Sequence, residues 1–280
     1  MNIKKILSNL KVEKDGIYSG KIINDSQKYE IKIRNKAYNF NKFSKKNLLT
    51  EISKHHSIQV MDKEINRITK KIKENSVILD VGGGWGWHWR NIHLQRPDLT
   101  VVIIDFSKNN LQQALKILDK FINKSVYLVN GNACQLPFPK NCFDLVWSVG
   151  VFQHIPDFDI AIKETYRVLK KNGIFINYSY NNAFFTKLIY KVFNKEYVVN
   201  GFKSDGLYLN RACNNQKKTI ESIFGTFIDE DRYTELLFDI SLKLNPKIRD
   251  YINYFDSFIG NNLMISGLIA RQRSFKIKKN

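Results

Sequence analysis

The residues with the clearest chemical potential are three alternating glycines that follow an apolar stretch. Gly82, Gly84 and Gly86 come directly after Val77–Val81, and this stretch contains Asp80. A glycine-rich turn that leads into a helix offers backbone N–H groups and the positive end of the helix dipole to an anionic group. A pyrophosphate and a carboxylate would both suit such a turn, so the turn alone leaves the ligand open.

The spacing of the glycines separates these two ligands. A dinucleotide-binding turn has the pattern G-x-G-x-x-G, and its third glycine position falls on Trp87, which is too large for close packing of helix against strand. The pattern here is D-x-G-x-G-x-G, from Asp80 to Gly86. Because a carboxylate at Asp80 would repel a pyrophosphate, the pattern favours a ligand that carries a cation.

A second carboxylate, Asp105, ends the next apolar stretch, Thr100–Asp105, roughly twenty residues after the glycines. A carboxylate at such a strand end can accept hydrogen bonds from both hydroxyls of a ribose. The ring of the following residue, Phe106, can lie against a purine. Asp105 alone could instead cap the helix expected from Asn109, but with Asp80 and the glycines before it the ribose role is favoured.

Five blocks between residues 77 and 178 resemble, in order, the motifs of class I S-adenosylmethionine-dependent methyltransferases. They are Asp80–Gly86, Asp105, the adenine-binding block 130–139, the block 143–148 with the segment 151–157 after it, and the helix 164–173. The resemblance implies a doubly wound α/β fold with a seven-stranded, mostly parallel, Rossmann-like sheet. It also implies S-adenosylmethionine as the cofactor and methyl transfer as the activity.

The resemblance assigns cofactor contacts to individual residues. Gly82, Gly84 and Gly86 would hold the methionine part, Asp80 would lie near its ammonium group, and Asp105 would hold the ribose. Asn132 and Ala133 would meet the adenine, and Phe106 and Ser148 complete the predicted cofactor-binding set. The family usually has aspartate at position 132; asparagine keeps an acceptor oxygen and loses the charge, which predicts a weaker contact.

A general base is needed only if the nucleophile arrives protonated. His154 lies just past the fourth strand and is the candidate; its alternative role is to order the loop before Pro156. His88, on the helix expected after the glycines, is interpreted as structural. Tyr166 and Lys170 form a Y-x-x-x-K pair, interpreted as a helix face far from the site.

The methyl acceptor is less well specified than the cofactor. The chain has no Asn/Asp-Pro-Pro-aromatic motif and no Pro-Cys dipeptide, so it lacks the resemblance to methyltransferases that modify amino-purines or cytosine rings. Residues 178–208 are rich in aromatic and apolar side chains. This segment is predicted to cover a small apolar, aromatic or lipid-like acceptor, and its alternative role is an extra helix that packs its own apolar stripe.

The elements that would position these residues alternate regularly. Short apolar strands are expected at 77–81, 100–105, 126–129, 145–149 and 174–178, with helices at 57–75, 87–95, 109–122 and 158–171. Strands at 227–238 and 263–271 follow, and the resemblance places the last one antiparallel between the fifth and sixth. We expect an N-terminal β-meander in 1–56, a methyltransferase domain in 57–280, and a helical insertion at about 179–222.

Composition adds expectations about partners. Lys+Arg 45 against Asp+Glu 26 gives a net charge of +19, mostly from lysine, whereas phosphate recognition favours arginine. A small molecule is therefore the expected acceptor and nucleic acid is not; an RNA methyltransferase and a non-catalytic cofactor-binding protein are the alternatives. The three cysteines lack metal-site spacing, so no metal is expected. Without a leader or a membrane-spanning run, the protein is expected in the cytoplasm, where contact with a membrane surface and the oligomeric state stay open.

Overall fold

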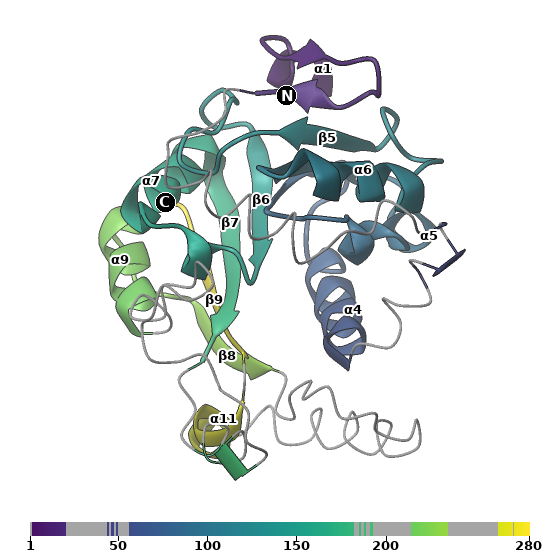
Figure 1. Ribbon diagram of the computed structural model, residues 1–280. Coiled ribbons are helices and arrows are strands. Elements are labelled where there is room, and N and C mark those ends of the chain that lie inside the picture. The colour runs from purple at the N-terminus through teal and green to yellow at the C-terminus, as the bar shows by residue number, and fades with distance from the viewer. Residues whose placement is uncertain are drawn as a thin grey trace.

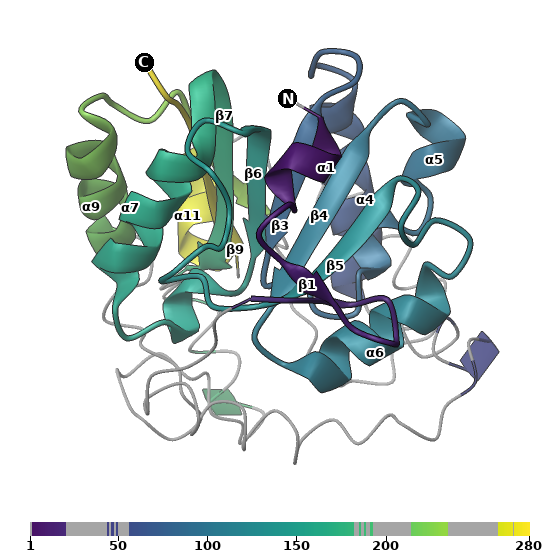
Figure 2. The ribbon, with the colours of Figure 1, turned by 90° about the horizontal axis from the view of Figure 1, so that it is seen from above.

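A mixed sheet runs through the computed structural model, with helices on both of its faces (Figure 1, Figure 2). The structure describes residues 2–20, 56–181, 214–234, 263–270 and 272–280, with single positions at 44, 46, 47, 49, 185, 188, 191 and 192. In this part the strands lie in the order β1-β2-β5-β4-β3-β6-β7-β9-β8. Their bounds are β1 Lys11–Val12, β2 Tyr18–Ser19, β3 Val77–Val81, β4 Thr100–Asp105, β5 Val126–Asn130, β6 Phe143–Val149, β7 Leu169–Tyr180, β8 Glu230–Thr234 and β9 Gln272–Lys278.

The central strands confirm the predicted doubly wound α/β fold. β5, β4, β3, β6 and β7 are parallel to their neighbours, and the chain order reverses between β3 and β6. In such sheets ligands bind beyond the carboxyl ends of the strands, at the point of reversal. The sheet has nine described strands and not the predicted seven, because β1 and β2 extend it beyond β5.

Two helical layers cover the sheet, and each central strand is buried on both sides. Alternate residues of β3 show this: Ile78 packs with the layer of α4, α5 and α6, whereas Leu79 packs with the layer of α1, α7 and α9. Burial on both faces explains why these strands are continuous apolar runs in the sequence. The bounds of these helices are α1 Ile3–Ile6, α4 His56–Thr69, α5 Ile92–Gln95, α6 Lys108–Ile117, α7 Phe158–Val168 and α9 Asn214–Phe224.

The C-terminal part corrects one expectation. The run predicted as a strand at 263–271 is largely helix α11, Leu263–Ile269, and the last strand is β9. A short continuous apolar run does not distinguish strand from helix, whereas β9 is fixed by its pairing and by the buried Phe275 and Ile277. β9 nevertheless lies antiparallel between β7 and β8, as the family resemblance implied.

All four predicted helices are shorter than expected, and those at 57–75 and 109–122 end at Thr69 and Ile117. The helix expected over 87–95 is divided into a 3-10 turn, η2 (Trp87–Trp89), and α5. The helix expected over 158–171 ends at Val168, because Leu169 has extended backbone angles and begins β7 by pairing with Phe143. Lys170 therefore lies on a strand, where its ammonium group binds Asp144 at 2.7 Å, and not on a helix beside Tyr166.

The first residues of the chain join the main sheet. β2 pairs parallel with β5, and Lys108 at the start of α6 binds both Glu13 and Asp15, the latter at 3.3 Å. Most of the β-meander expected in residues 1–56 lies outside the described residues, as does most of the aromatic segment 178–208. Within the described part, no helix is both long and apolar enough to cross a bilayer.

A buried charged cluster fixes α4 to the sheet. Tyr178 on β7 donates a hydrogen bond of 2.6 Å to Glu64 Oε2, and Arg67 Nη2 lies 2.9 Å from the same oxygen. Arg232 on β8 lies 3.4 Å from the other carboxylate oxygen. Burial and the neighbouring Glu64 carboxylate raise the pKa of Tyr178 well above its ordinary value, so the hydroxyl stays a donor. The cluster joins α4, β7 and β8.

We expect Glu64→Ala to destabilise the fold by about 3 kcal/mol, because it leaves the Tyr178 hydroxyl and the facing guanidinium groups without their buried carboxylate. Tyr178→Phe removes one hydrogen bond and should cost only about 1 kcal/mol. Urea denaturation at neutral pH measures both values. Equal losses from the two variants would contradict the view that the carboxylate is the centre of the cluster.

Candidate functional site

The glycine turn closes the carboxyl end of β3. Gly82 N donates to Ile104 O at 2.7 Å, and Gly86 N donates to Gly83 O at 2.8 Å. These bonds hold the turn against β4 and fold it back on itself. The chain then enters η2, so the amide groups of the turn lie at the switch point of the sheet.

The glycines of the turn differ in what surrounds them. A Cβ built on Gly86 would lie 2.5 Å from Leu118, and one on Gly83 would lie 2.3 Å from Asp80 Oδ2. Gly84, like Gly86, has a positive φ, here 53°. A Cβ on Gly84 would meet nothing closer than Asp105 Oδ2 and Gly82 O, both at 3.9 Å. Gly84 is therefore the open position of the turn, while Gly83 and Gly86 are closed by packing.

Asp105 lies beside this open position. Gly84 N donates to Asp105 Oδ2 at 3.0 Å, and Ser107 N donates to Oδ1 at 2.8 Å. The amide of Asn110 also donates to Oδ1, at 3.3 Å. The structure thus brings the predicted glycine turn and the predicted ribose carboxylate together, with the carboxylate orientation fixed by backbone donors.

Asn130 shapes the same strand end, although the sequence did not single it out for this. Its side-chain amide donates to Asp105 O at 3.0 Å and to Phe106 O at 3.1 Å. These two bonds hold the half-buried Phe106 just beyond the carboxylate. Only its place at the end of a predicted strand could have indicated this role.

Asp80 lies beneath the turn and is 1% exposed. Trp89 Nε1 donates to its Oδ2 at 2.7 Å. Burial, reinforced by the nearby Asp105 carboxylate and opposed by the Trp89 hydrogen bond, raises the pKa of Asp80 from 3.8 to about 7. The carboxyl group is therefore balanced between its two protonation states near neutral pH, and a cation above it would favour the ionised form.

The predicted adenine residues follow β5. Asn132 is buried, and its Oδ1 accepts a hydrogen bond of 2.8 Å from Cys134 N. Ala133 is half-buried beside it. Ser148 is fully buried in β6, where its hydroxyl donates to Val81 O at 3.0 Å. Ser148 thus links β6 to the last residue of β3, directly before the glycine turn.

The loop after β6 packs directly against the glycine turn. A Cβ built on Gly82 would lie 2.3 Å from Val151 Cγ2. The loop leads into a 3-10 turn, η3 (Phe152–His154), which contains the predicted base His154 in a half-buried position. His154 N donates to Val151 O at 2.8 Å, so this residue also orders the loop through its backbone.

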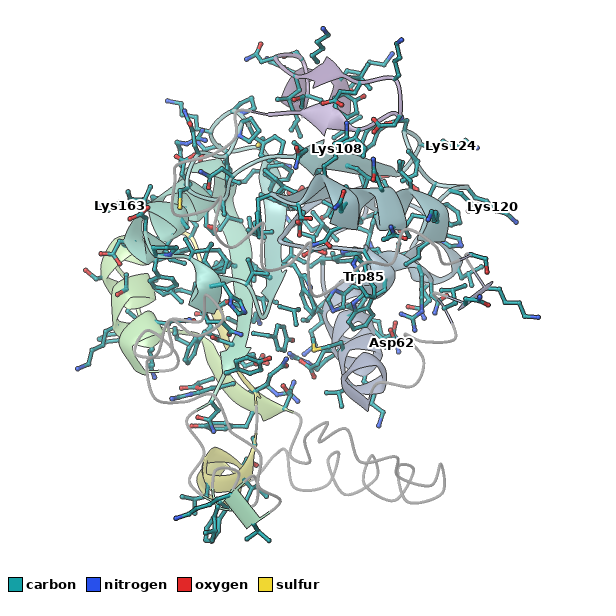
Figure 3. The ribbon with its side chains drawn as sticks, viewed as in Figure 1. Asp62, Trp85, Lys108, Lys120, Lys124 and Lys163 are labelled. Atoms are coloured by element: carbon teal, nitrogen blue, oxygen red, sulfur yellow. The ribbon has the colours of Figure 1, made fainter. Side chains whose placement is uncertain are left out.

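Aromatic side chains line the α4 side of the turn. The rings of Trp87 and His88 are 3.7 Å apart, and His88 is 6.1 Å from Trp147. Burial lowers the pKa of His88 to about 3, with a smaller contribution from Arg90, so this imidazole is neutral. Figure 3 shows Trp85 between α6 and α4; its indole N–H donates to Asn110 at 3.3 Å.

The lysine excess is distributed over separate elements. Lys120, Lys124 and Lys163 are exposed and point outward in Figure 3, the first two beyond α6 and the third from α7. Lys108 is engaged with the acidic N-terminal residues. Lysines on these elements do not form a single basic surface at the glycine turn.

The geometry agrees with comparisons to known proteins. Residues 79–177 match the family model described as a methyltransferase domain. The malonyl-[acyl-carrier protein] O-methyltransferase of Buchnera aphidicola is 34% identical over 158 residues, which are 55% of this chain and 60% of that protein. The 2-methyl-6-phytyl-1,4-hydroquinone methyltransferase 2 of Oryza sativa is 36% identical over 97 residues, 35% of this chain and 27% of that protein.

Solved structures show the same fold. Phosphoethanolamine N-methyltransferase 2 of Haemonchus contortus, in complex with S-adenosyl-L-methionine, superimposes with a TM-score of 0.54 at 19% identity, over 86% of this chain and 61% of that one. The chain spans at most 60% of the length of the two curated relatives named above. The family match covers the strands and loops that build the site, so residues 79–177 are a methyltransferase domain, which supports a class I S-adenosylmethionine-dependent methyltransferase.

Proposed function

We propose that this protein transfers a methyl group from S-adenosylmethionine to an oxygen, nitrogen or carbon atom of a small apolar or aromatic acceptor. The observation that supports this most directly is the open position at Gly84 at the switch point of the sheet, where the Gly84 amide binds Asp105 and the neighbouring Gly83 packs against Asp80. We also propose that residues 57–280 form the catalytic domain, with an insertion at about 179–222.

The chain's own residues fit the parts of this cofactor. The glycine turn from Gly82 to Gly86 would hold the methionine part, and Asp80 would attract its ammonium group from beneath the turn. Asp105 would accept the ribose hydroxyls, Phe106 would lie against the adenine, and Asn132 and Ala133 would border it. S-adenosylmethionine supplies a methyl group on a positively charged sulfur. The main contribution of the protein to transfer is to hold the two reactants in line.

An apolar acceptor is supported by the residues after β7. Phe185, Leu188 and Val192 are spaced as on one face of a helix, and they are exposed by 44%, 48% and 71%. The relatives named above act, by their names, on a malonyl thioester carrier and on a hydroquinone with a phytyl chain. His154, in the loop against the glycine turn, is the proposed base for an acceptor that arrives protonated.

Calorimetry with S-adenosylmethionine tests the cofactor site. The intact protein should bind it, and Asp105→Ala should weaken binding about tenfold or more, because the buried ribose contacts are lost. Asp105→Asn keeps the acceptor oxygen that faces Ser107 N and should weaken binding less. Absence of binding to the intact protein would contradict the proposed function, and equal binding by Asp105→Ala would contradict the ribose assignment.

A deproteinised bacterial metabolite extract, incubated with methyl-labelled S-adenosylmethionine, tests the activity. Labelled product in the small-molecule fraction is expected. Label that enters added RNA, with a steep dependence of RNA binding on salt, would instead indicate a nucleic-acid substrate. Binding of the cofactor with no transfer to any fraction would indicate a cofactor-binding protein without catalysis.

A further inference from the structure

Four buried polar side chains form one hydrogen-bonded chain on the α9 side of the sheet. Asn177 Nδ2 donates to Gln216 Oε1 at 2.8 Å, and Gln216 Nε2 donates to Ser179 Oγ at 3.0 Å. Ser179 Oγ in turn donates to Gln153 Oε1 at 2.7 Å. None of the four is more than 1% exposed. Each of the three hydrogen bonds is donated in the same direction, from Asn177 towards Gln153.

The orientation of the last amide in this chain is fixed. Tyr180 N donates to Gln153 Oε1 at 3.0 Å, and a backbone N–H can only donate, so the atom that receives it must be the oxygen. Gln153 Nε2 therefore carries two N–H groups, and it is buried without a hydrogen-bond partner in the described part of the chain. Such buried donors are rare in folded proteins because leaving them unpaired is unfavourable.

The unpaired donor belongs to the loop that packs against the glycine turn. Gln153 belongs to η3, beyond the carboxyl end of β6, and its Nε2 would lie 3.8 Å from a Cβ built on Gly150. Val151, in the same loop, packs against Gly82 of the glycine turn. The donor is thus carried by the loop that borders the turn at the switch point of the sheet.

We propose that the side-chain amide of Gln153 binds the acceptor through an oxygen that is the nucleophile or is conjugated with it, as in a carboxylate, phenolate or enolate. This proposal rests on the proposed function and specifies its substrate class. An oxygen has a second lone pair, so it can accept a hydrogen bond and still attack. An amine nitrogen has one lone pair, and a donor placed on it would compete with attack. The neutral amide therefore favours oxygen acceptors over amines.

Two variants and a matched control separate this role from a structural one. Gln153→Glu keeps the oxygen that receives Ser179 and Tyr180 N but replaces the donor, whereas Gln153→Met removes both. Gln95→Met, at an exposed glutamine at the end of α5, is the control for loss of an amide. Each variant is titrated with S-adenosylhomocysteine and then assayed with ¹³C-methyl S-adenosylmethionine in the deproteinised extract described above.

We expect S-adenosylhomocysteine affinity within about twofold of the parent in all three variants. Methyl transfer should fall about tenfold or more in both Gln153 variants and stay unchanged in Gln95→Met, since a hydrogen bond to an anionic oxygen contributes about this factor. The ¹³C spectrum of the product should show a methyl group on oxygen, or on carbon conjugated with oxygen.

Several results would overturn the proposal. An N-methylated product would exclude an oxygen acceptor. Full transfer by Gln153→Glu together with loss in Gln153→Met would show that only the hydrogen bonds within the fold matter. Full transfer by both variants would show that the Gln153 amide does not bind the acceptor. If the parent protein transfers no methyl group, the proposed function itself fails, and that failure is recognised before any variant is compared.

Discussion

Replacing Gly84 by arginine is expected to abolish the binding of S-adenosylmethionine while the chain stays folded. Gly84 is the open position of the glycine turn, so a side chain there enters the space proposed for the cofactor and not the core. The positive φ of 53° would cost about 1 kcal/mol, which a domain of this size tolerates. The expected loss in affinity is at least a hundredfold, measured by calorimetry.

Gly86→Ala is the matched control for this prediction. It introduces a much smaller side chain, but its Cβ would lie 2.5 Å from Leu118 and 3.0 Å from Ile103 in the core. We therefore expect Gly86→Ala to lower the melting temperature more than Gly84→Arg does. If Gly84→Arg unfolds the protein, or if it binds the cofactor normally, the assignment of Gly84 to the cofactor is wrong.

The affinity for S-adenosylmethionine is expected to depend on pH through Asp80. Burial raises the pKa of this carboxyl group to about 7, so below that pH a proton replaces the charge that would attract the cofactor's ammonium group. Affinity should fall by up to about tenfold per pH unit below 7. Above about pH 8 the ammonium group loses its own proton, so binding should be strongest between these limits. Calorimetry from pH 5 to 9 measures this profile.

Asp80→Asn should remove the acidic limb of the profile and weaken binding at pH 7.5. Without cofactor, the same substitution should increase the stability of the fold at neutral pH, because it removes a buried charge. Because the folded pKa lies above the unfolded value of 3.8, the parent loses stability as pH rises from about 4 to 7. The loss is on the order of 4 kcal/mol over that interval, and Asp80→Asn should lack it in urea denaturation without cofactor. Identical pH profiles for parent and variant would contradict both expectations.

The sequence predicted the central strands well because their signals are local. Val77–Val81 and Thr100–Asp105 are continuous apolar runs, as strands buried on both faces must be, and the structure has strands with the same bounds. The alternation of strand and helix then leaves few topologies, since crossover connections are right-handed. The same alternation predicts that the glycine turn and Asp105 lie at the carboxyl ends of two neighbouring parallel strands, as they do.

Elements that depend on distant partners were less predictable. Leu263–Ile269 is a helix, and the last strand of the sheet is Gln272–Lys278 (β9). β9 is a strand because it forms its hydrogen bonds with β7 and β8, more than thirty residues away in sequence. The addition of Tyr18–Ser19 to the far edge of the sheet depends likewise on β5. A local apolar pattern carries no information about such pairing.

The amino-acid sequence by itself determined which residues gather at the carboxyl edge of the sheet, because parallel strands place their ends together and the D-x-G-x-G-x-G turn specifies its own backbone. Only the tertiary structure decided the state of those residues. The raised pKa of Asp80 comes from burial beneath the turn and from the Asp105 carboxylate, against the opposing hydrogen bond from Trp89. The orientation of the unpaired Gln153 amide comes from a hydrogen-bonded chain that passes through Gln216 on α9. Both depend on groups that only folding brings into contact, and water exclusion around them sets their energies.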